Sequence, residues 1–203
     1  MTRAGIGRRS FLSLSVGLAG CAWQPRPQRF TGYGTIAEVT GLALAPGGRL
    51  LALSTLAGDI VLFDAASLKA QSSKLARAGE ALLAFDVSHE SLIAVVAAER
   101  RSRVIVDDLA SGQGGDVLSL DGRVTHMRVA RLGKHAIFLT ETGNVSVVDL
   151  GTAATVANWP GVKPNDLAIS GRGEQVAWAT EAGVSLGSPN SAALHTLTTK
   201  APP

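Results

Sequence analysis

The chain has 203 residues, of which 46% are hydrophobic and only 4% aromatic, so it is long enough for one domain whose core consists of aliphatic side chains. Its net charge of +3 comes from Arg3, Arg8 and Arg9, because without these three the 19 basic residues fall to 16 and equal the 16 acidic ones. A neutral remainder excludes the strongly basic surface that binds nucleic acid, so we expect no nucleic-acid partner.

The N-terminal segment has the pattern of an export signal. Arg8 and Arg9 precede an apolar stretch of roughly ten residues, which is shorter than a membrane span of about 20 residues. The run 8–12 resembles the bacterial twin-arginine signal, and four residues carry this resemblance: Arg8, Arg9, Phe11 and Leu12. The run Leu18-Ala19-Gly20-Cys21 resembles the lipobox of bacterial lipoproteins.

The lipoprotein resemblance implies that residues 1–20 are removed and that Cys21 becomes the lipid-bearing first residue. It further implies a periplasmic protein on a membrane anchor, and Ala22 in place of Asp implies the outer rather than the inner membrane. Residues 21–34 are then the lipidated cysteine and an extended tether. The alternative is a general secretory signal, in which the arginines are only its charged start and Cys21 is an ordinary small residue.

Short apolar runs alternate with turn signals from residue 40 onward. The stretch 40–71 predicts strands at 42–45, 50–55 and 60–63, which are separated by Pro46-Gly47-Gly48-Arg49 and Ala57-Gly58-Asp59. These runs are too short for ordinary helices, so the pattern indicates an antiparallel meander.

The same pattern returns three more times along the chain. The residues that close the third strand of each copy are 44, 41 and 39 positions apart; they are Asp64, Asp108, Asp149 and Ser188. The predicted fold class is therefore all-β, with four four-stranded antiparallel units in the repeat region 35–200, at about 35–78, 79–121, 122–160 and 161–200. The fourth copy is the weakest, because Pro189-Asn190 interrupts it.

These units resemble the blades of WD40-type or YVTN-type β-propellers. Phe63, Asp107 and Val148 stand where the family has tryptophan, so the resemblance does not extend to the family's His–Asp network. Four blades are also fewer than the about seven that usually close a ring. Three arrangements remain open: a partial propeller, an unusually small ring, or completion by another copy through open strand edges.

The residues with reactive or metal-binding side chains show no spacing typical of a catalytic or metal site. No pair of the four histidines has metal-ligand spacing and the chain has one cysteine, so we expect neither a metal site nor a cofactor, and we assign no catalytic residue. Six aspartates are expected at turns, where their side chains accept hydrogen bonds from backbone N–H groups. They are Asp59, Asp64, Asp108, Asp116, Asp121 and Asp149.

Two functions fit this sequence. The first is a lipid-anchored interaction module without catalysis, which binds protein partners. In it the dense charge run 99–103 would dock an acidic partner or an anionic surface at Arg100, Arg101 and Arg103; the alternative for this run is a solvated hairpin tip. The second is a propeller enzyme or ligand-binding domain, lactonase-like or quinone-dependent dehydrogenase-like. Its site would lie in the central channel, where Glu80, His126 and Asp166 at the strand starts are the polar candidates.

Overall fold

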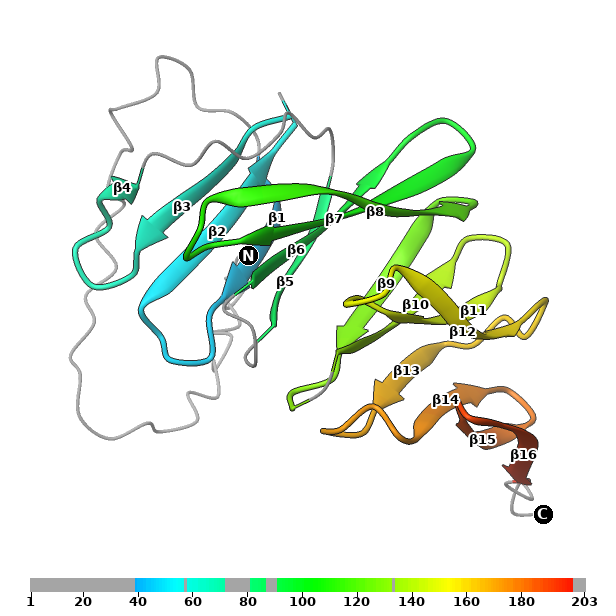
Figure 1. The fold of residues 1–203 in the computed structure, drawn as a ribbon. Coiled ribbons are helices and arrows are strands. Elements are labelled where there is room, and N and C mark those ends of the chain that lie inside the picture. The colour runs from blue at the N-terminus through cyan, green and yellow to red at the C-terminus, as the bar shows by residue number, and fades with distance from the viewer. Residues whose placement is uncertain (1–38, 57, 72–80, 87–90, 133, 199–203) are drawn as a thin grey trace, which may run out of the picture. The chain divides into compact units, whose positions relative to one another are not determined.

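The computed structural model describes residues 39–56, 58–71, 81–86, 91–132 and 134–198, except for the side chains of residues 192 and 193. Within these residues the chain is all-β and forms four four-stranded antiparallel sheets (Figure 1). In every sheet the strands follow one another in chain order, so each sheet comes from one continuous stretch of sequence. The predicted fold class is confirmed.

The strands of each sheet have the following bounds. The first sheet comprises β1 (Val39–Leu44), β2 (Leu50–Thr55), β3 (Ile60–Asp64) and β4 (Ala70–Gln71), and the second comprises β5 (Ala81–Asp86), β6 (Ser91–Ala97), β7 (Arg101–Asp108) and β8 (Gln113–Asp121). The third sheet comprises β9 (Val124–Val129), β10 (His135–Thr140), β11 (Val145–Asp149) and β12 (Ala154–Trp159), and the fourth comprises β13 (Asp166–Ile169), β14 (Val176–Thr180), β15 (Gly183–Ser188) and β16 (Ser191–Leu197).

The β1–β2 turn shows how local sequence fixes these hairpins. The N–H of Ala45 donates to the carbonyl of Leu50 at 2.8 Å, and the N–H of Gly48 donates to the carbonyl of Ala45 at 2.7 Å. Gly48 has a φ of 68°, in the left-handed region where a side chain would be strained. The Pro-Gly-Gly cluster therefore forms the tight turn that the sequence predicts.

The fourth sheet is complete, although its sequence is the most divergent copy. Pro189-Asn190 does not interrupt the unit but forms the turn between β15 and β16, where the N–H of Asn190 donates to the Ser188 hydroxyl at 3.3 Å. Proline is acceptable at this point because a turn does not require its missing N–H group. His195 lies in β16.

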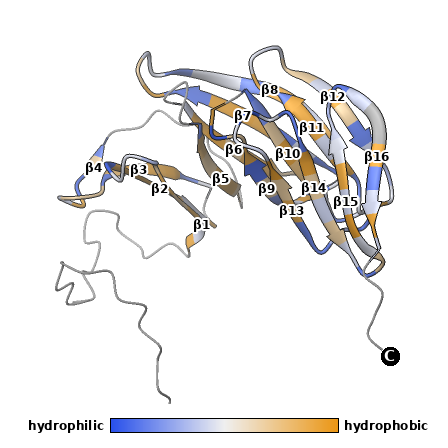
Figure 2. Cartoon of the chain, turned by 90° about the horizontal axis from the view of Figure 1, so that it is seen from below, coloured by the Kyte–Doolittle hydropathy of each residue, from blue (hydrophilic) through white to orange (hydrophobic). Residues whose placement is uncertain are grey.

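Three apolar clusters fill the spaces between consecutive sheets. The first contains Ala52, Ile60 and Leu62 with Leu92 and Ile105; the second contains Ile93, Val95 and Val104 with Phe138 and Val148; the third contains Ile137, Leu139 and Val147 with Val176 and Trp178. The second and third sheets therefore bury both faces. This explains why β6 and β10 read as continuous apolar runs rather than as alternating strands, as the orange segments in Figure 2 illustrate.

Buried serine hydroxyls join consecutive sheets at the point where the chain passes between them. Ser54 donates to the carbonyl of Ala81 at 3.0 Å, which links the first sheet to the second. Ser102 donates to the carbonyl of Gly122 at 3.1 Å and accepts from the N–H of Val124 at 2.8 Å, which links the second to the third. Both serines are fully buried, so these bonds fix the start of the next sheet with no competition from water.

Candidate functional site

The aspartates that close the third strand of three sheets have a structural role. Each side chain accepts hydrogen bonds from backbone N–H groups two or three residues further along the turn. The bonds run from Ser67 to Asp64 at 2.7 Å, from Ala110 and Ser111 to Asp108 at 2.8 Å, and from Gly151 and Thr152 to Asp149 at 2.8 and 3.0 Å. The turn role predicted for these three residues is confirmed. Asp116 departs from the prediction, because it lies within β8 rather than at a turn.

These hydrogen bonds set the ionisation of the turn carboxylates. The pKa of Asp64 is lowered from its ordinary value of 3.8 by the hydroxyl and backbone N–H of Ser67, and the pKa of Asp108 is lowered by the N–H of Ser111. Asp149 is partly desolvated, which raises its pKa, but the N–H groups of Thr152 and Gly151 outweigh this effect and the net shift is downward. Asp107 shows the opposite behaviour, because burial raises its pKa and its Oδ2 has no hydrogen-bond partner.

Neighbouring Asp108 and Asp107 should therefore give opposite pH dependence. A lowered pKa in the folded state adds stability above the unfolded pKa, and this contribution is lost as pH falls through the folded value. We expect Asp108→Asn to flatten the fall in unfolding free energy between about pH 5 and 3. The raised pKa of Asp107 makes the unfolding free energy of the parent fall as pH rises from the unfolded pKa through the folded one. Asp107→Asn lacks this group, so the unfolding free energy of the variant relative to that of the parent increases with pH over this range. Urea unfolding over a pH series measures the unfolding free energy of both variants. An equal dependence of this free energy on pH in the two variants would contradict the opposite pKa shifts of Asp107 and Asp108.

The basic run forms part of a strand rather than a hairpin tip. The turn between β6 and β7 consists of residues 98–100, so only exposed Arg100 lies in it, while Arg101 and Arg103 belong to β7. Arg101 lies 3.3 Å from a carboxylate oxygen of Asp121, and Arg103 lies 3.4 Å from one of Asp116. Exposed pairs of this kind contribute about 0–1 kcal/mol. Docking of an acidic partner at these arginines stays a prediction, and the partner would compete with both aspartates.

The polar candidates for a channel site are only partly described. Glu80 lies outside the described residues. His126 is exposed on β9, with Nδ1 3.1 Å from the Thr125 hydroxyl, and Asp166 begins β13. Asp166 pairs with Arg128 at 3.4 Å across the third and fourth sheets. The sequence did not indicate this pair, because the two residues are far apart in the chain and only the packing of β9 beside β13 brings them together.

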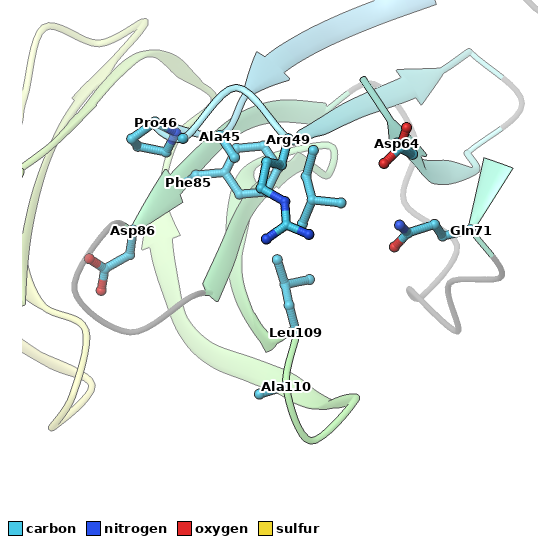
Figure 3. A pocket seen from close by; sticks show the side chains of 11 residues that line it. Ala45, Pro46, Arg49, Asp64, Gln71, Phe85, Asp86, Leu109 and Ala110 are labelled. Carbon is cyan, nitrogen blue, oxygen red and sulfur yellow. The ribbon is translucent and has the colours of Figure 1, made fainter. Parts of the chain in front are cut away.

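A cavity of about 440 Å³ lies between the first two sheets (Figure 3). The guanidinium of Arg49 points into it, while Asp64 and Gln71 lie on one side and Phe85 and Leu109 supply apolar walls. A second cavity of about 280 Å³ is lined by residues of β1, β5, β6 and β9 and includes Arg123, Thr125 and Glu141. Because turns and strands of different sheets build both cavities, no local motif could have predicted them.

An open apolar face belongs to the first sheet. Strand register places six residues on the side opposite the first apolar cluster, and we call them the first open face: Leu42, Leu44, Leu51, Leu53, Val61 and Phe63. Leu42 is 63% exposed and Leu44 is 59% exposed. Leu51, Leu53 and Val61 are half-buried and Phe63 is buried, so the exposed part of this face is the pair Leu42 and Leu44.

A second open apolar face belongs to the fourth sheet. The side opposite Trp178 carries six apolar residues and two polar ones, which together we call the fourth open face: Ala168, Ala177, Ala179, Val184, Leu186 and Leu197 with Asp166 and His195. Leu197 is 62% exposed and Leu186 is 39% exposed. Among the described residues, the apolar clusters lie on the other faces of the first and fourth sheets.

The export and lipidation residues, Arg8 to Cys21, lie outside the described residues. Within the described part, no three histidine, cysteine, aspartate or glutamate residues lie together in a way that could hold a metal ion. The same residues include no helix with the length and hydropathy of a membrane span.

Comparison with known proteins shows the fold alone. No family model and no curated protein matches the chain. Among solved structures it is similar to the β-propeller domain of Cps50 (Swd1) from Myceliophteria thermophila, with a TM-score of 0.52 and 12% sequence identity over 73% of this chain. The match covers 51% of that structure, so the chain spans about half its length. The sheets described above therefore have the architecture of β-propeller blades.

Proposed function

We propose that this chain is a lipid-anchored periplasmic module of the β-propeller type that binds other proteins and catalyses no reaction. The observation that carries the proposal is the first open face, on which Leu42 and Leu44 are more than half exposed. Burial of apolar surface contributes about 25 cal/mol per Å², and contiguous exposed apolar patches mark sites where proteins bind one another.

The anchor in this proposal rests on the sequence. Residues 8–12, which resemble a twin-arginine signal, would direct export to the periplasm. Residues 18–21, which resemble a lipobox, would direct the attachment of lipid to Cys21. A single lipid chain binds membranes only marginally, so stable anchoring requires the several chains that bacterial lipoproteins carry. The tether then holds the sheets in the periplasm near the outer membrane.

A second candidate function is the binding of a small ligand, which the cavity around Arg49 favours. The guanidinium of Arg49 would pair with an anionic group, and the walls formed by Phe85 and Leu109 would contact an apolar portion of the same ligand. A propeller enzyme with a channel site would instead use the cavity near Arg123 and Glu141. The fold alone does not distinguish a ligand-binding domain, an enzyme and an interaction module, because β-propellers serve all three functions.

The anchor is tested by cell fractionation. We expect the parent chain in the membrane fraction and the Cys21→Ser variant in the soluble periplasmic fraction, because the serine hydroxyl does not accept the lipid. A Cys21→Ser chain that stays with the membrane would contradict the lipid anchor.

The binding role is tested by photo-crosslinking in the same cells. A photoreactive amino acid in place of Leu42 should give covalent adducts with protein, whereas one in place of Ser119, which is exposed in β8, should not. The absence of adducts at position 42, or equal adducts at both positions, would overturn the interaction role.

A further inference from the structure

We infer that the cavity between the first two sheets binds a zwitterionic α-amino acid with an apolar side chain, whose carboxylate lies at Arg49 and whose ammonium group lies at Asp64. This inference rests on the small-ligand role given above as the second candidate function and names the class of ligand. The cavity volume of about 440 Å³ lies within the roughly 300–1,000 Å³ of small-molecule sites.

Arg49 and Asp64 reach the cavity from neighbouring strands of the first sheet. Arg49 ends the turn between β1 and β2, and Asp64 ends β3 opposite Leu50, the residue that follows Arg49. The N–H of Ala65 donates to the carbonyl of Arg49 at 2.8 Å, so the backbone fixes the two positions relative to each other. In Figure 3 the guanidinium of Arg49 points into the cavity, and Asp64 lies across from it beside Gln71.

The opposite charges of Arg49 and Asp64 lie near each other but form no ion pair. The charge of Arg49 lowers the pKa of Asp64, after the larger effects of the Ser67 hydroxyl and N–H, so the carboxylate is ionised at neutral pH. The ion pairs within the described part of the chain join other residues. Both hydrogen bonds from Ser67 end on Oδ1 of Asp64, which leaves Oδ2 for a ligand.

A ligand with both charges suits this pair of residues better than a ligand with one charge. Asp64 would repel an anion at Arg49, and Arg49 would repel a cation at Asp64, whereas a zwitterion is attracted at both ends. The guanidinium can also bind an α-carboxylate through two parallel hydrogen bonds. Asp86 also lines the cavity, but it is 4% exposed, has an interaction of its own, and turns its carboxylate away from Arg49 (Figure 3).

The apolar walls of the cavity select the side chain of the amino acid. Phe85 and Leu109 line the cavity from the second sheet, and both are half-buried. They pack against the first apolar cluster, which holds them in place. An aliphatic side chain that covers their exposed parts removes apolar surface from water on both partners. The cavity therefore favours an apolar amino acid over a small polar one.

Three related probes test the inference by titration of the whole chain, followed by NMR chemical shifts, with Cys21→Ser in every sample to prevent lipidation. L-Leucine carries both charges, N-acetyl-L-leucine carries only the carboxylate, and L-leucinamide carries only the ammonium group. We expect leucine to bind with a Kd of about 1 mM or below, and each of the other two probes to bind at least about tenfold more weakly.

Matched variants assign each charge of the ligand to its residue. Arg49→Gln should remove the preference for leucine over leucinamide, and Asp64→Asn should remove the preference for leucine over N-acetyl-leucine. Asparagine keeps an oxygen that accepts the bonds from Ser67, so the turn is preserved. Two controls should leave the leucine affinity unchanged: Arg172→Gln at an exposed arginine of the β13–β14 turn, and Asp149→Asn at the turn aspartate of the third sheet. Circular dichroism confirms that each variant is folded.

Three results would overturn the inference. The first is the absence of leucine binding, and the second is a leucine affinity that neither Arg49→Gln nor Asp64→Asn changes. The third is binding of N-acetyl-leucine or leucinamide as tightly as leucine, which would show that the cavity takes a ligand with one charge. In that case the small-ligand role stands and only the assignment to a zwitterion fails.

Discussion

Replacement of Phe138 by alanine should lower the free energy of unfolding by about 3–5 kcal/mol. Phe138 is fully buried in β10 and belongs to the cluster that also contains Ile93 and Val104 of the second sheet. Removal of the ring leaves a cavity between the second and third sheets. Each of these sheets also packs on its other face, so their strands cannot collapse into the cavity without losing contacts there. Urea unfolding followed by circular dichroism measures the change.

Matched variants separate this cavity effect from a general effect of substitution. Phe138→Leu keeps most of the apolar volume and should cost less than Phe138→Ala. Leu132→Ala, at a 67% exposed position, should change the unfolding free energy by no more than about 0.5 kcal/mol. A loss for Phe138→Ala no greater than that for Leu132→Ala would show that the second and third sheets do not pack as described.

Gly41→Ala should destabilise the junction between the first two sheets through two effects, each worth about 1–3 kcal/mol. A Cβ atom at Gly41 would collide with the carbonyl oxygen of Ala81 and lie 2.5 Å from the hydroxyl of Ser54. These two groups form the hydrogen bond that links the sheets, so the substitution overpacks the site and leaves a buried acceptor unsatisfied.

Gly47→Ala provides the control for this prediction. An added Cβ at Gly47 has open space around it, so the same chemical change should have an effect within about 0.5 kcal/mol. Thermal or urea unfolding of both variants gives the comparison. Equal stability of Gly41→Ala and Gly47→Ala would refute the tight contact between β1 and the start of β5.

The strands and turns were predictable because their signals are local. Pro46-Gly47-Gly48 fixes a turn through backbone conformation, and Asp108 and Asp149 close turns through bonds to residues two or three positions away. Such features depend on a few neighbouring residues. The sequence therefore contains all the information that the all-β meander requires.

Features that depend on strand length or on packing between sheets were not predictable in the same way. Charge density placed Arg101 and Arg103 at a hairpin tip, whereas pairing with β8 extends β7 through both. Pro189-Asn190 resembled an interruption because the sequence does not show which residues continue the ladder on either side. The Arg128–Asp166 pair and the Arg49 cavity arise only when separate sheets meet.

The origin of each sheet in one uninterrupted stretch of chain has a consequence for how genes of this kind change. A cut between Asp121 and Val124, or between Trp159 and Asp166, would pass between sheets and sever no strand ladder. Duplication or deletion of such a segment therefore adds or removes a whole sheet while every remaining ladder keeps its partners. Chains built in this way can vary in length by units of about forty residues without loss of their folding pattern.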